Sequence, residues 1–168
     1  MVGGEKKEED RESYHLRDST VQKLLHAGAA ARDDDMRVVC DQDSNLDAAH
    51  CFDLNRVKKD TDFASLGIVE CNVVSNVLTM CKLCHKAYDH NMLCIKPEDD
   101  SIVICDAFLV CSPHKADFAP LNGKAVRKPV QAHKLLVWPL KAVFEDRYKN
   151  FCEQVELRRE NNGKYPYY

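Results

Sequence analysis

The stretch that decides the fold runs from Asn76 to Asp89 and reads N-V-L-T-M-C-K-L-C-H-K-A-Y-D. A shorter stretch, L-D-A-A-H, ends at His50 and precedes it across a long connection. Residues 76–80 predict a short extended segment, and 81–90 predict a helix of two to three turns. Three polar side chains, His50, Asn76 and His85, therefore lie along a predicted strand, loop and helix.

Before this frame, Val21, Leu24 and Leu25 follow helical spacing, which predicts a helix from Ser19 to Arg32. Residues 37–40 and 46–50 are candidate strands that flank a turn rich in Asp, Asn and Ser. We therefore expect 37–50 to form a β-hairpin.

After this frame, residues 92–96 and 101–106 are rich in β-branched side chains and predict a second β-hairpin. Three prolines make 112–130 a predicted loop. An amphipathic pattern then indicates a long C-terminal helix that starts near Pro139 and reaches Glu160.

The chain has 168 residues, 45% hydrophobic and 30% charged, which is typical of a globular protein with one ordinary domain. We expect a disordered lead-in over 1–13 and a single domain over 14–168, with its core at 37–110 and a helical extension at 133–160. No apolar run approaches the roughly 20 residues that a membrane span needs. The charged N-terminus also lacks a secretory signal. We therefore expect an intracellular protein, in the cytoplasm or the nucleus, that is neither secreted nor bound to a membrane.

Charge is unevenly distributed along the chain. Residues 37–123 hold 8 basic and 13 acidic side chains, a net −5, whereas 124–168 hold 10 basic and 5 acidic, a net +5. A basic C-terminal part could meet phosphate, or it could be an ordinary solvated face.

The strand end Ala48-Ala49-His50 and the run from Met80 to Asp89 resemble the HNH family of ββα-metal nucleases. They are most similar to a subgroup with an Ala-Ala-His strand end and a Cys-x-x-Cys-His-x-x-Phe-Asp type helix. The resemblance implies an α+β fold with a ββα-metal core, and a metal-dependent endonuclease that hydrolyses phosphodiester bonds of double-stranded DNA.

The resemblance also implies roles for individual residues. His50 would be the general base, because imidazole has an unperturbed pKa near neutrality. Asn76 would pin the catalytic loop and orient that base. His85 would hold one divalent cation, Mg²⁺ or Mn²⁺, which stabilises charge on the phosphate and the leaving oxygen.

The second metal ligand stays open at this point. Many family members carry a ligand just before the base, but here that residue is Ala49. Asp89 lies four residues after His85, on the same helix face, and could chelate the same ion. Asp47 lies two residues from Ala49 on one strand face and is the competing candidate.

The cysteines allow two readings. Cys81 and Cys84 have the C-x₂-C spacing of half a structural zinc site, for which Cys40, Cys71 or Cys94 could add ligands. The alternative is a set of buried apolar thiols. Nine cysteines in an intracellular chain are expected to be reduced or metal-bound rather than paired in disulfides.

DNA contact would come from lysines near the site, which neutralise phosphates without reading sequence: Lys58, Lys59, Lys82 and Lys86. A homodimer whose interface is the C-terminal helix is a further expectation, since cutting both strands needs two sites. Two other functions remain open: a catalytically inactive nucleic-acid-binding module of the same fold, and a zinc-stabilised protein-interaction domain.

Overall fold

The structure is a computed structural model that describes residues 19–40, 46–52, 66–67, 72–135 and 137–160. Over this part the protein has a mixed α+β fold, as the sequence predicted. The expected lead-in over 1–13 and the turn at 41–45 lie outside the described residues.

The centre of the fold is a two-stranded antiparallel sheet followed directly by a helix. Strand β1 (Leu46–His50) pairs with β2 (Val77–Cys81), so that His50 lies opposite Val77. Helix α3 (Lys82–Asp89) starts at once after β2. Its N-cap is Cys81, whose Sγ accepts a hydrogen bond from the backbone N–H of Cys84 at 3.3 Å. The predicted ββα arrangement is confirmed.

The predicted β-hairpin over 37–50 is wrong. Residues 37–40 form no strand; the Val38 N–H donates to the Thr79 carbonyl at 3.0 Å, and the Val38 carbonyl accepts from the Arg127 N–H at 2.8 Å. The segment thus lies beside β2 without forming a ladder. The turn-rich residues 41–45 favoured a local hairpin, but the partner of β1 comes from across the connection 51–76.

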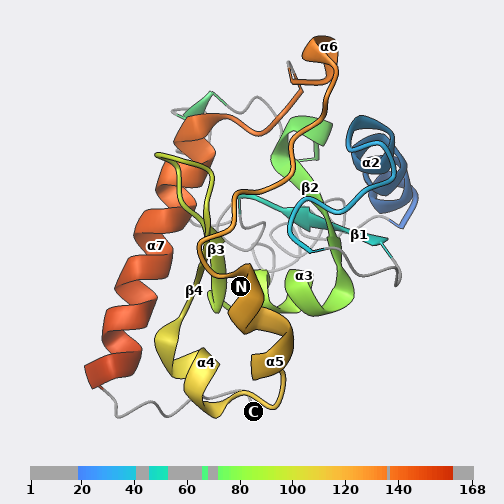
Figure 1. Ribbon diagram of the computed structural model, residues 1–168. Coiled ribbons are helices and arrows are strands. Elements are labelled where there is room, and N and C mark those ends of the chain that lie inside the picture. The colour runs from blue at the N-terminus through green and yellow to red at the C-terminus, as the bar shows by residue number, and fades with distance from the viewer. Residues whose placement is uncertain (1–18, 41–45, 53–65, 68–71, 136, 161–168) are drawn as a thin grey trace, which may run out of the picture.

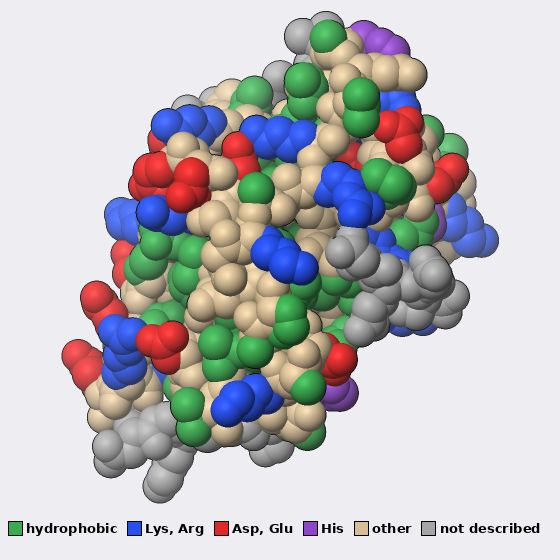
Figure 2. All heavy atoms as spheres, in the orientation of Figure 1, with side chains coloured by type: hydrophobic (Ala, Val, Ile, Leu, Met, Phe, Trp, Pro, Cys, Tyr) green, Lys and Arg blue, Asp and Glu red, His purple; other side chains and the backbone are tan. Residues whose placement is uncertain are grey.

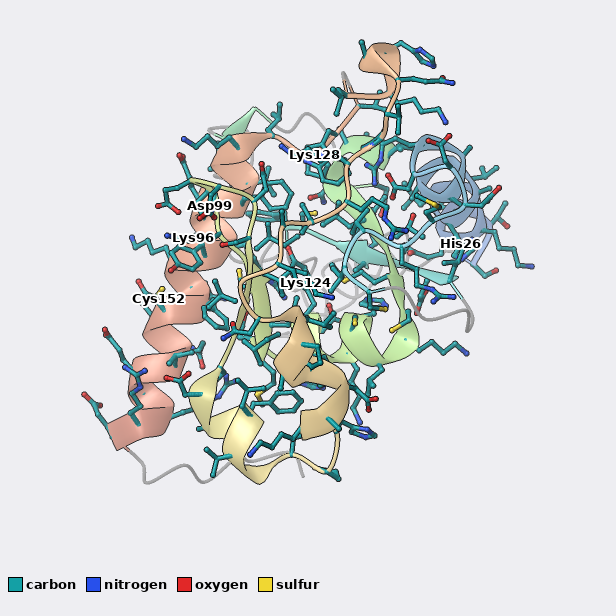
Figure 3. All side chains as sticks on the ribbon, viewed as in Figure 1. His26, Lys96, Asp99, Lys124, Lys128 and Cys152 are labelled. Atoms are coloured by element: carbon teal, nitrogen blue, oxygen red, sulfur yellow. The ribbon has the colours of Figure 1, made fainter. Side chains whose placement is uncertain are left out.

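Helix α2 (Ser19–Arg32) matches its predicted bounds and packs on the β1–β2 sheet through Ala29, Ala48 and Val77. The His26 ring Nε2 lies 2.8 Å from the Leu46 carbonyl at the start of β1 (Figure 3). Gly28 allows this close approach, because a Cβ at that position would lie 2.6 Å from a methyl carbon of Val74.

Strands β3 (Leu93–Ile95) and β4 (Ile102–Ile104) form the second predicted hairpin. The long C-terminal helix α7 (Lys141–Glu160) packs against β3 through its buried face. In Figure 1, α7 and α2 stand on opposite sides of the molecule, with the two small sheets and α3 between them.

The predicted loop over 112–130 is partly helical. After α4 (Asp106–Cys111) come α5 (Lys115–Phe118) and a 3-10 turn, η3 (Ala119–Leu121), and a short α6 (Ala132–Leu135) follows later. Phe108 and Phe118 are buried edge to face, with ring centroids 4.9 Å apart. This aromatic contact packs α4 against α5.

Several basic side chains of the C-terminal part are paired with acidic side chains of the body. Lys128 pairs with Asp100 and Arg159 with Asp106. Figure 2 shows basic and acidic side chains interspersed on the face in view rather than gathered by sign. No helix among the described residues combines the length and apolar character required to cross a bilayer.

Candidate functional site

His85 is held between two carboxylates that come from different elements. Its Nδ1 lies 2.9 Å from an oxygen of Asp47 on β1, and its Nε2 lies 3.1 Å from an oxygen of Asp89 on α3. Asp89 reaches the ring because residues four apart share one helix face. Asp47 reaches it because alternate residues of β1 face α3. Both candidates for the second metal ligand therefore contact the predicted first ligand.

The two carboxylates keep a proton on His85. Burial by itself lowers the pKa of the imidazole, but hydrogen bonds to Asp89 and Asp47, together with their negative charges, outweigh burial and raise the pKa from 6.5 to about 9. The metal-free site thus holds an imidazolium ion flanked by two carboxylates near neutral pH. A cation that binds His85 has to displace this proton.

His50 is the last residue of β1 and is half-buried. It lies three residues beyond Asp47, at the end of the strand from which the chain leaves the sheet. The residue before it, Ala49, is fully buried in the core between the sheet and α3 and offers no donor to a metal.

Asn76 is fully buried in the 3-10 turn η2 (Val74–Asn76) just before β2. Its Oδ1 accepts a hydrogen bond from the Phe52 N–H at 2.9 Å, and its backbone carbonyl accepts from the Cys51 N–H at 2.7 Å. Two successive peptide groups after His50 are therefore fixed by one residue. This contact links the end of β1 to the start of β2.

Three buried cysteines gather at the other end of α3: Cys40, Cys81 and Cys84. Their sulfur atoms all lie within 4.8 Å of one another, and the Cys40 and Cys81 sulfurs are 3.5 Å apart. Hydrogen bonds from Cys40 and Cys84 lower the pKa of Cys81, whereas the bonds of Cys84 to Cys40 and Cys81, with burial, raise the pKa of Cys84. One thiolate is thus favoured within the cluster even without a metal.

Of the other predicted ligands, the one that the structure describes does not join this cluster. Cys94 is buried at β3 and points its thiol at the Ile95 carbonyl, 3.7 Å away. Cys71 lies outside the described residues. Tetrahedral zinc, with Zn–S bonds of about 2.3 Å, separates its thiolates by about 3.8 Å, and the three-cysteine cluster fits that spacing.

Two of the four predicted DNA-contacting lysines can be located. Lys82 and Lys86 are exposed, and their spacing of four residues places them on one face of α3. Lys58 and Lys59 lie outside the described residues.

The sequence did not predict that helix α7 contacts the end of α3 that carries Asp89. Arg147 and Arg158 of this helix donate to backbone carbonyls at the C-terminal end of α3. No motif marks these arginines in the sequence, because their acceptors are carbonyl groups about 60 residues away, which any residue type would supply equally.

In a comparison with known protein families, residues 37–96 fit a family model described as HNH endonuclease. The matched segment contains β1, β2, α3 and the site residues between them. Searches of curated proteins and of solved structures find no significant match.

Proposed function

We propose that the HNH endonuclease domain at residues 37–96 of this chain hydrolyses phosphodiester bonds of double-stranded DNA with the help of one divalent cation. The observation that carries the proposal is the triad of Asp47, His85 and Asp89, in which one imidazole meets two carboxylates beside the strand that ends in His50.

The donor set fits a cation such as Mn²⁺ or Mg²⁺. His85 Nε2 and the Asp89 carboxylate face each other at 3.1 Å, and both would hold the ion. Asp47 takes the other ring nitrogen, as carboxylates behind metal-binding histidines do, and would fix the tautomer that leaves Nε2 free to ligate. When bound, the cation supplies Lewis-acid stabilisation of negative charge on the phosphate and the leaving sugar oxygen.

In this proposal His50 takes the proton from the attacking water as a general base. Asn76 supports it indirectly, since it fixes the two peptide groups that follow His50 and so limits where the end of β1 can move. Because Ala49 offers no ligand, the ion would keep several positions for water and phosphate oxygens. Weak metal affinity in the absence of DNA follows from this small protein ligand set.

Lys82 and Lys86, with Lys58 and Lys59 from the long connection, would neutralise backbone phosphates. Such contacts give salt-dependent binding that is largely independent of sequence. A homodimer would present two such sites to the two strands of one duplex.

Plasmid nicking tests the proposal. Wild-type protein with Mn²⁺ or Mg²⁺ should nick supercoiled DNA, and His50→Ala and His85→Ala should each slow nicking by about 100-fold or more. His133→Ala, which changes an exposed histidine of α6, should stay within about two-fold of wild type. Duplex binding without nicking would instead identify an inactive binding module, and nicking that survives both site variants would refute the assigned roles.

The three-cysteine cluster favours a second metal with a different task. We infer that Cys40, Cys81 and Cys84 bind a structural zinc ion that fixes the start of α3, where Cys81 is already the N-cap. Dialysed protein should retain one zinc per chain, and Cys→Ser at any of the three should lose it, whereas Cys152→Ser on α7 should not. Retained zinc in a protein without nuclease activity or DNA affinity would favour the protein-interaction domain.

A further inference from the structure

The C-terminal end of the eight-residue helix α3 is fixed by several hydrogen bonds. His90 is its C-cap, and Asn91 adopts the left-handed conformation with φ +52°. The Met92 N–H donates to the Ala87 carbonyl at 2.8 Å, and the Asn91 N–H donates to the Tyr88 carbonyl at 3.0 Å. This is the Schellman pattern of helix termination, which satisfies the Ala87 and Tyr88 carbonyls within the chain and fixes the path of residues 90–92.

Two arginines of α7 donate hydrogen bonds to backbone carbonyls in the last turn of α3 and just beyond it. Arg158 donates from its two terminal nitrogens to the carbonyls of His90 and Asn91, each at 2.6 Å. Arg147 is 4% exposed and donates to the Tyr88 carbonyl. Its guanidinium carbon also lies 4.3 Å from the centroid of the Tyr88 ring. The last turn of α3 is thus held by cationic donors from a helix outside the matched segment 37–96.

This arrangement bears on Asp89, which lies between the carbonyls that the arginines hold. A carboxylate at the last residue of a helix faces the negative end of the helix dipole and is disfavoured there. Two guanidinium groups on the flanking carbonyls offset that field. Arg147 holds the peptide group that precedes Asp89, and Arg158 holds the two peptide groups that follow His90. Together they restrain the chain before and after Asp89, and hence the direction from which its carboxylate reaches His85.

We propose that Arg147 and Arg158 are positioning residues of the metal site, which hold the end of α3 so that Asp89 and His85 can share one cation. The inference rests on the proposed function only in naming Asp89 and His85 as the ligands. It extends the functional unit to α7, so that a nuclease core cut at residue 96 would lack part of the support for its own metal site.

Metal binding without DNA tests the inference separately from nuclease activity. Calorimetric titration of the full chain with Mn²⁺ should give a dissociation constant about ten-fold or more higher in Arg158→Met than in wild type, as for lost supports of metal ligands. Arg158→Lys should recover part of that loss. Arg159→Met is the matched control, since the neighbouring Arg159 is exposed and pairs with Asp106 rather than α3. Its dissociation constant should stay within about two-fold of wild type.

A double-mutant cycle separates positioning from general destabilisation. In an Asp89→Ala background, Arg158→Met should change Mn²⁺ affinity by less than about two-fold, because the ligand that the arginine positions is gone. An unchanged dissociation constant in folded Arg158→Met would overturn the inference, as would an equal loss in both backgrounds. If Arg158→Met does not fold, the same cycle with Arg158→Lys decides. Wild-type protein that binds Mn²⁺ but nicks no DNA refutes the nuclease function and leaves this inference standing.

Discussion

The carboxylate of Asp47 lies 2.9 Å from Nδ1 of His85, so a residue of β1 and a residue of α3 are joined at the point where the strand and helix pack together. The contact turns the Nε2 side of the ring toward Asp89, which is four residues further along α3. Each of the two acidic residues thus engages a different nitrogen of the same imidazole, and the proposed function gives each its own task.

The first prediction separates their tasks. Asp47→Asn should raise the Mn²⁺ dissociation constant by about 10-fold to 100-fold, because an amide orients the imidazole less strongly than a carboxylate. Asp89→Ala should weaken binding more, since it removes a ligand. Calorimetric titration measures both, and a larger effect of Asp47→Asn than of Asp89→Ala would exchange the two roles.

The second prediction concerns pH in metal-free protein. The pKa of His85 is raised to about 9 in the folded state from an ordinary 6.5. The folded state therefore binds the proton more tightly, and the stabilisation is fully present below about pH 6.5 and is lost as pH rises through about 9. Urea unfolding in EDTA should show this loss between pH 6.5 and 9 for wild type and a smaller loss for His85→Gln. Equal slopes in the two proteins would contradict it.

The third prediction addresses metal affinity over the same pH range. Because a proton occupies His85 below pH 9, each Mn²⁺ bound should release close to one proton at pH 7. The apparent affinity should rise by about ten-fold per pH unit between 7 and 8.5. Calorimetry in buffers of different ionisation enthalpy counts the protons, and no release at pH 7 would show that the cation binds elsewhere.

The fourth prediction concerns Asn76. Asn76→Ala leaves the buried Phe52 N–H without its acceptor, which should lower the free energy of unfolding by about 1–3 kcal/mol. If the amide also orients the end of β1, nicking at saturating metal should fall further than the folded fraction does. Denaturant unfolding and plasmid nicking on one preparation compare the two losses, and a matched loss would reduce Asn76 to a structural role.

The fifth prediction concerns the buried ion pair behind the sheet. Arg32 and Asp33 are joined by two hydrogen bonds of 2.6 and 2.8 Å, and Asp33 also accepts from the Thr79 N–H of β2. Arg32→Met leaves a buried carboxylate uncompensated and should cost about 3–5 kcal/mol of stability. Lys128→Met, which breaks an exposed pair, should cost less than about 1 kcal/mol. Urea unfolding measures both, and similar losses would contradict the difference in burial.

Much of the fold was predictable because its signals are local. The helix over Ser19–Arg32 has periodic apolar residues and a polar first residue, and α7 has the same amphipathic pattern after Pro139. The hairpin of β3 and β4 is closed by a short turn whose residues mark it in the sequence. Each of these elements depends on neighbours within a few residues.

The errors have a different origin. Residues 38–40 are apolar and precede a turn-like segment, so the sequence predicts 37–40 as the partner of β1, but β2 takes that place from beyond residue 76. The spacing in the sequence also named Cys81 and Cys84 and left Cys40, Cys71 and Cys94 open as further ligands, whereas only the fold shows that Cys40 joins the pair. The hydrogen bonds from Arg147 and Arg158 to the end of α3 could not be predicted from the sequence, because every residue type has the same backbone carbonyl acceptor.

The pairing of β1 with β2 across residues 51–76 has a kinetic consequence. Neither strand has its pairing partner close in the sequence, so the chain has to close the connection between them before the ladder can form. Refolding should therefore be limited by this closure rather than by the growth of helices. On the ribosome, His50 and His85 are synthesised well before Arg147 and Arg158. The last turn of α3 therefore exists before the two arginines that hold it.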